Sequence, residues 1–177
     1  MQGQPCPFGQ VYFQTRTANS ISQWTVALRA QYHIRNIQRI ERGEHQPGVM
    51  LALRLVAATN VNVGDFFALL ASFAFQRKNP QSTPKAEKTP PVQPKYEKAQ
   101  LEGVKCLFGP LIHQARLAAE ISQAEVAQKV QYNLRNVGAV EKGKQEPGVM
   151  VALGMVTATE ANVETFFNML HELASAR

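Results

Sequence analysis

The chain has 177 residues and a formal net charge of +6, with 45% hydrophobic, 18% charged and 8% aromatic residues. This composition is typical of globular proteins and argues against a wholly disordered chain, and no apolar run approaches the roughly 20 residues that a membrane-spanning helix needs. The two cysteines are too few for a disulfide scaffold or a structural zinc site.

The sequence contains one pattern twice. Shifted by 100 residues, it matches itself without a gap, and 31 of the 65 positions from 6 to 70 are identical to their partners. Two copies of this length indicate a duplicated domain rather than a solenoid. The residues between the copies are rich in proline and lysine, which is typical of an extended, semi-rigid linker. We therefore predict one domain over residues 6–75, a linker over 76–105 and a second domain over 106–177.

Each copy is predicted to form five short helices, which makes the fold class all-α. The apolar residues recur at helical spacing, and no stretch alternates with period two for long enough to be a convincing strand. Ser, His and Asn can cap the start of a helix, whereas glycine commonly ends one. In the first copy these signals predict helices from about Phe8 to Asn19, after Ser22, from near His33 to Gly43, from Pro47, and after Asn62.

The second and third predicted helices carry a recognisable motif. Residues 121–130 read ISQAEVAQKV and are followed by Asn133, Glu141, Gly143 and Pro147; the first copy has the same frame. This set of spacings closely resembles the phage-repressor (Cro/repressor, XRE-type) helix-turn-helix family. The resemblance covers both copies almost end to end. It implies two tandem DNA-binding domains, in each of which the third helix enters the major groove of double-stranded DNA.

In the first copy, the outward positions of the third helix are Ile34, Arg35, Asn36, Gln38 and Arg39. Arginine can pair bidentately with guanine and Asn or Gln with adenine, at about 1–3 kcal/mol of discrimination per good pair. These residues are therefore candidate base readers, although the same polar side chains could simply solvate an exposed helix.

Two further candidates for DNA contact lie at the edges of the motif. The resemblance assigns a phosphate contact to Gln23 at the start of the second helix, where the helix terminus favours anions. Arg42, which follows the third helix, is a candidate for a second phosphate contact.

The second copy is weaker at the same positions. Its candidate DNA-binding residues are Gln123, Arg135, Asn136, Lys142 and Lys144. On its third helix, however, Leu134, Gly138 and Ala139 stand where the first copy has Ile34, Gln38 and Arg39. Residues 106–177 carry six Lys/Arg and seven Asp/Glu (−1), against six and three (+3) in residues 6–75. This copy is therefore either a weaker DNA reader or a domain that binds a protein partner.

The resemblance also implies structural roles. Arg16 with Glu41, and Arg116 with Glu141, match a partly buried ion pair that ties the first helix to the third in this family. Both copies depart from the family in the turn, where Gln31 and Gln131 replace the usual glycine. These glutamines either take a left-handed conformation, at roughly 1 kcal/mol or more, or the turn is reshaped.

These features predict a sequence-specific transcriptional regulator, most simply a repressor, in the cytoplasm and associated with the nucleoid. The alternative is a protein-interaction regulator, such as an anti-activator or an antitoxin-like protein, in which one or both domains bind a protein instead of DNA. No catalytic constellation or metal-ligand spacing is legible, so we expect neither an enzyme nor a cofactor.

Two features leave the assembly of the protein open. The Phe73–Phe75 end of the fifth helix is a possible homodimer face. Cys6 and Cys106 are expected to be free thiols in a reducing compartment, although a redox bridge between them is conceivable.

Overall fold

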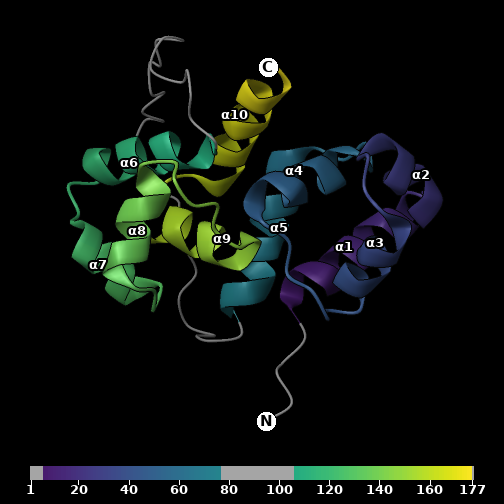
Figure 1. Cartoon of the computed structure of the whole chain (residues 1–177), viewed down its shortest axis with the longest axis horizontal. Helices are drawn as coiled ribbons and strands as arrows, with labels where there is room; N and C mark the ends of the chain where they lie inside the picture. The colour runs from purple at the N-terminus through teal and green to yellow at the C-terminus, as the bar shows by residue number, and fades with distance from the viewer. Residues whose placement is uncertain (1–5, 77–105, 177) are drawn as a thin grey trace.

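The computed structural model describes residues 6–76 and 106–176, so the predicted linker over 76–105 lies almost entirely outside the described residues. Within the described part of the chain, the fold is all-helical, as predicted, with ten α-helices and no strand (Figure 1). None of these helices is long and apolar enough to cross a membrane. Helix α5 ends at Gln76, one residue beyond the predicted boundary.

The ten helices fall into two sets of five that match helix by helix at an offset of 100 residues. We call residues 6–76 the first repeat and residues 106–176 the second repeat. The first repeat contains α1 (Pro7–Ala18), α2 (Gln23–Arg29), α3 (Ile34–Glu41), α4 (Val49–Ala57) and α5 (Val63–Gln76). The second contains α6 (Phe108–Ala118), α7 (Gln123–Lys129), α8 (Leu134–Glu141), α9 (Val149–Ala158) and α10 (Val163–Ser175).

The ends of these helices follow from local side-chain chemistry. The Ser22 hydroxyl accepts the N–H of Thr25 at 3.0 Å, and the side-chain Oδ1 of Asn62 accepts the N–H of Asp65 at 3.0 Å. Each contact satisfies one of the amide groups that a first helical turn leaves without a partner. Gly43 follows α3 with a φ of 73°, a backbone conformation that favours glycine and ends the helix.

Each repeat buries the inner faces of its helices around aromatic side chains. In the first repeat α3 packs against both α1 and α2, and α5 packs against α1. The rings of Phe8, Tyr12 and Phe66 contact one another, with Phe8 and Tyr12 stacked at 5.6 Å. Ile37 and Ile40 of α3 are fully buried. The inner face of α3 is thereby fixed, and its opposite face is left to the surface.

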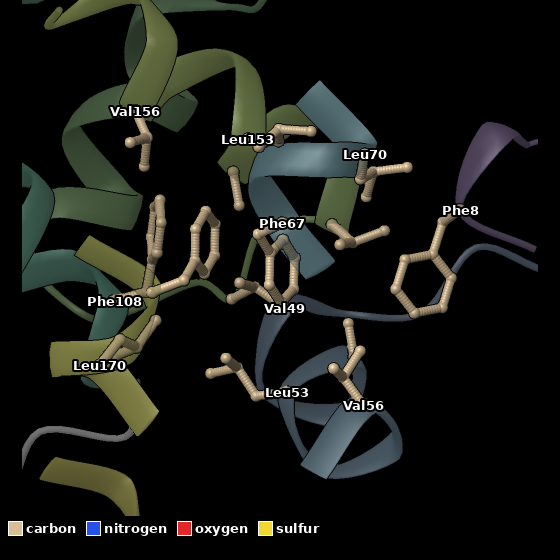
Figure 2. Packing of buried hydrophobic residues seen from close by; sticks show 14 of the residues in the cluster. Phe8, Val49, Leu53, Val56, Phe67, Leu70, Phe108, Leu153, Val156 and Leu170 are labelled. Carbon is tan, nitrogen blue, oxygen red and sulfur yellow. The ribbon is translucent and has the colours of Figure 1, made fainter. Parts of the chain in front are cut away.

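The two repeats pack directly against each other, a contact that no sequence pattern indicated. Helix α5 lies along α10, and the rings of Phe67 and Phe167 stack at 3.8 Å with an interplanar angle of 7°. The buried apolar side chains of both repeats form one continuous cluster, with Phe67 at its middle (Figure 2). In Figure 1, α2 and α3 lie at one end of the long axis, and α7 and α8 lie at the other.

This contact occupies the helix on which a homodimer face was expected. Helix α5 packs along α10 of the same chain, and Phe73 is packed against the shared cluster. On the same helix, Leu69 is 55% exposed and Phe75, near its end, is 36% exposed. Part of the apolar surface of α5 is therefore packed within one chain.

Candidate nucleic-acid interface

The turn between α2 and α3 takes one of the two forms expected from the sequence. Gln31 has a φ of 49° and Gln131 a φ of 51°, so both occupy the left-handed region. The N–H of Tyr32 donates to the carbonyl of Ala27 at 3.0 Å, and Tyr132 repeats this bond to Ala127 at 2.9 Å. The turn is therefore tight without a glycine, and the two repeats share the same geometry.

The side chains of α3 divide into a buried and an exposed face. Ile37 and Ile40 are fully buried, whereas Arg35 and Arg39 are exposed. The predicted base-reading residues Ile34, Asn36 and Gln38 are half-buried on the flanks. The imidazole Nδ1 of His33 accepts the N–H of Arg35 at 3.2 Å and so caps the start of this helix.

Gln23 is held in place by neighbouring side chains. Its Nε2 donates to Glu41 at 2.6 Å, and its Oε1 accepts from Gln38 at 3.3 Å. Gln23, the predicted phosphate contact, is therefore hydrogen-bonded to Gln38, a candidate base reader on α3. These residues border a shallow depression of about 410 Å³ lined by Phe13, Gln23, Gln38, Glu41 and Arg42.

Phe13 is a residue of this surface that sequence reasoning missed. Its side chain is 46% exposed and lies beside the depression. The guanidinium carbon of Arg16 lies 5.6 Å from the centre of the Phe13 ring. The signal was present in the sequence, because Phe13 stands one turn before Arg16 and is replaced by His113 in the other copy.

Both expected ion pairs are present. Arg16 Nε donates to Glu41 Oε1 at 2.6 Å, and Arg16 Nη1 also donates to the carbonyl of Ile21 at 2.6 Å. Arg116 and Glu141 repeat the pair at 2.7 Å. Each guanidinium therefore ties the first helix of its repeat to the third helix and to the segment before the second.

The carboxylate of Glu141 has more partners than that of Glu41. His113 Nδ1 lies 2.7 Å from Glu141 Oε2, and Gln123 Nε2 donates to the same oxygen at 2.8 Å. Burial raises the pKa of Glu141, but the hydrogen bonds from Arg116, Gln123 and His113 outweigh it and hold this pKa below its usual value. Glu141 is therefore a charged, structural carboxylate at neutral pH.

The surface of α8 is less polar than that of α3. Leu134 is 50% exposed, Arg135 is exposed and Asn136 is half-buried. A Cβ on Gly138 would have only Gln123 Oε1 nearby, at 3.6 Å, so this surface has room for a larger side chain. Ala139 is half-buried.

The segments that follow α3 and α8 differ in charge. Arg42 donates to Glu44 at 2.6 Å, and the Nε of Arg39 lies 3.9 Å from the same carboxylate. The residue equivalent to Glu44 is Lys144, which is exposed together with Lys142. The second repeat thus places two lysines where the first pairs an arginine with an acid.

Trp24 and the two cysteines lie outside the contacts described above. Trp24 is 62% exposed on α2, so it is a surface residue of the motif. Cys6 and Cys106 are free thiols, half-buried and buried respectively, and burial raises the pKa of each. The two thiols are therefore poorly reactive near neutral pH.

Comparison with protein-family models, with curated proteins and with solved structures finds no match to this chain.

Proposed function

We propose that the protein is a sequence-specific, DNA-binding transcriptional regulator, acting as a repressor on nucleoid DNA in the cytoplasm. In this proposal each five-helix repeat is one helix-turn-helix domain, and residues 76–105 link the two. One observation carries the proposal: α3 buries Ile37 and Ile40 and exposes Arg35 and Arg39 on its other face. An exposed helix face of this chemistry fits the major groove, where arginine can bind guanine bidentately.

The contact between the repeats supports an inverted pair of half-sites. The Val49 N–H donates to the carbonyl of Pro147 at 3.0 Å, and the Val149 N–H donates to that of Pro47 at 2.9 Å. Reciprocal bonds of this kind relate the repeats by an approximate two-fold axis, and a two-fold reader pairs with a two-fold DNA site. The two arms of the site would differ in sequence, because α3 and α8 differ at three of their five outward positions.

The first test is selection of bound duplexes from random-sequence DNA by the whole chain at about 150 mM salt, where non-specific binding is weak. We expect an enriched site with two inverted, non-identical arms. Replacing Arg35 and Arg39 by Ala should lower affinity by about 10- to 100-fold per lost base pair contact and erase one arm. Arg54→Ala is the control, because it removes an exposed charge from α4. No enrichment by the unaltered chain would refute the proposal.

A second function is favoured by Leu134. A leucine that is 50% exposed, beside Gly138 and Ala139, is poor chemistry for reading bases but suits a protein contact. In this version the first repeat binds DNA and the second binds a regulatory protein. Leu134→Glu then abolishes recovery of that partner while DNA selection by the first repeat is unchanged. If Leu134→Glu instead alters the selected DNA sequence, the second repeat reads DNA.

A further inference from the structure

The contact between the repeats is symmetric in its backbone. The two bonds that join residues 47–49 to 147–149 are equivalents of each other, and Phe67 stacks on its own equivalent, Phe167. A backbone arrangement of this kind is equally available to two first repeats or two second repeats from different chains. Whatever distinguishes these pairings must therefore lie in the side chains.

The side chains of the contact are not symmetric. Gly64 lies in the first turn of α5, so its amide has no partner within its own helix, and the residue is buried. Asn168 of α10 accepts this N–H at 2.8 Å. The residue equivalent to Asn168 is Ala68, which has no acceptor. Only the second repeat can satisfy this amide.

A second side-chain contact runs in the same direction. The N–H of Met50, in the first turn of α4, donates to Glu146 Oε1 at 3.0 Å. A carboxylate at this place also suits the positive end of the helix dipole. The equivalent residue in the first repeat is the neutral Gln46, whose amide lies against Gly148. Both side-chain caps therefore come from the second repeat, and both capped helices belong to the first.

The two repeats also differ in the size of the side chain at position 64 and its equivalent, 164. A Cβ on residue 64 would overlap the carbonyl oxygen of Glu164 and the side-chain amide of Asn168. Glycine at this position therefore allows α5 to approach α10 closely. The equivalent residue of the second repeat is Glu164. Two second repeats in this arrangement would direct a glutamate side chain onto Asn168 of the other, and two first repeats would leave both Gly64 amides buried without an acceptor.

We propose that this surface selects unlike repeats: the α4–α5 face of the first repeat binds the α9–α10 face of a second repeat and rejects a copy of itself. The determinants are Gly64 with Asn168, supported by Glu146. The partner of each repeat is thereby specified as the other repeat, so one chain supplies both members of the pair. This inference does not depend on DNA binding.

The decisive experiment exchanges the determinants within the full chain. Gly64→Glu with Ala68→Asn gives both repeats the residues of the second, whereas Glu164→Gly with Asn168→Ala gives both the residues of the first. Each two-site variant should raise the unfolding equilibrium constant, measured in urea, by about tenfold or more. The four-site variant moves the complementary pair to the other side of the approximate two-fold axis.

The four-site variant separates specific pairing from simple damage. It contains the same residues as the parent chain, so changes in helix propensity largely cancel, and its unfolding constant should return to within about threefold of the parent's. Failure of the four-site variant to recover relative to the two-site variants overturns the proposal, as does a two-site variant that is as stable as the parent.

Amide hydrogen exchange tests the same contact at one atom. Asn168→Ala should speed exchange of the Gly64 amide by about tenfold relative to a core amide such as that of Leu53. Asn19→Ala is the matched control, because Asn19 is exposed and its side chain bonds only within α1. Unchanged exchange at Gly64 in the Asn168 variant would contradict the proposed role of this side chain.

Discussion

At the scale of single residues, the turn between α2 and α3 is strained by the side chain it carries. Gln31 and Gln131 occupy left-handed conformations, which cost an L-residue roughly 1–2 kcal/mol. Glycine avoids this cost, but it adds about 0.4–1 kcal/mol of conformational entropy to the unfolded chain. Gln31→Gly is therefore expected to raise the free energy of unfolding by up to about 1 kcal/mol, as measured by urea denaturation.

The control for this substitution is Gln14→Gly. Gln14 is exposed within α1, where glycine is a poor helix former and should lower the free energy of unfolding by about 0.5 kcal/mol. If both substitutions destabilise the protein equally, the left-handed turn carries no strain that glycine relieves.

The buried carboxylate of Glu141 gives a prediction in pH. Glu141→Gln leaves the buried Arg116 guanidinium without its charge partner, which should cost about 3 kcal/mol of unfolding free energy at pH 7. The folded pKa of Glu141 lies below its usual value, so its stabilisation is present above about pH 4.3 and is lost as the pH falls through the folded pKa.

Urea denaturation between pH 7 and pH 3 measures this effect. The parent chain should lose stability on acidification more steeply than the Glu141→Gln chain, so the difference between the two narrows at low pH. Glu172→Gln, at an exposed position of α10, should follow the parent at both ends of the range. A constant difference from pH 7 to pH 3 would show that Glu141 acts through packing and not through its charge.

At the scale of helices, the sequence predicted most of the fold because the signals are local. Ser22, His33 and Asn62 cap the helices that they were expected to cap. The packing of α5 on α10 was not predictable in the same way. Periodicity shows that Phe66 and Phe67 are apolar and on a helix, but it does not say that one faces its own repeat and the other its neighbour.

The candidate site was also predicted only in part. The outward positions of α3 follow from helical periodicity, because Ile37 and Ile40 fix which face is buried. The bond from Gln38 to Gln23 and the position of Phe13 beside the depression depend on how α1 and α2 cross α3. These contacts arise from tertiary packing and leave no pattern in the order of residues.

Two helix glycines with opposite environments give the prediction at this scale. A Cβ on Gly138 of α8 meets open space, so Gly138→Gln should stabilise the second repeat by about 0.5–1 kcal/mol. Combined with Ala139→Arg, it also gives α8 the residues of α3 at these two positions and should raise affinity for a DNA site that carries the first-repeat arm twice. Unfolding in urea and DNA titration measure the two effects separately.

Gly109 is the control for this pair of changes. A Cβ there would overlap the backbone carbonyl oxygen of Val140 and lie 2.8 Å from the amide nitrogen of Gly143. Gly109→Ala should therefore destabilise the protein, because neither backbone can move away cheaply. If the Gly138 and Ala139 changes stabilise the chain without altering DNA affinity, α8 is not a DNA-reading helix.

At the scale of the whole molecule, the distance between the two candidate recognition helices is set by packing and not by the length of chain between the repeats. Helix α5 is stacked on α10, and reciprocal backbone bonds join residues 47–49 to 147–149. A pair fixed in this way presents α3 and α8 with one separation and one relative orientation. Residues 76–105 then only keep the repeats at a high effective concentration.

This geometry predicts a single permitted spacing between the arms of the DNA site. Insertion of five base pairs, about half a helical turn, moves one arm to the opposite face of the duplex and should lower affinity by about 100-fold. Insertion of about ten Gly/Ser residues after Pro91 should change affinity by less than about twofold, because loop-closure cost grows only slowly with length. Titrating the parent chain and the Gly/Ser insertion variant against the original duplex and the five-base-pair insertion duplex gives the four affinities needed.

Phe67→Ala should make the protein tolerate the five-base-pair insertion, so this variant tests whether packing between the repeats sets the spacing. Removing one ring of the Phe67–Phe167 stack weakens the contact between the repeats, so the two can separate and reach arms at either spacing. The penalty for five inserted base pairs should then shrink, while affinity for the original duplex falls. If the unaltered chain already tolerates the insertion and responds to the length of residues 76–105, the repeats bind DNA as separate modules and their packing does not set the spacing.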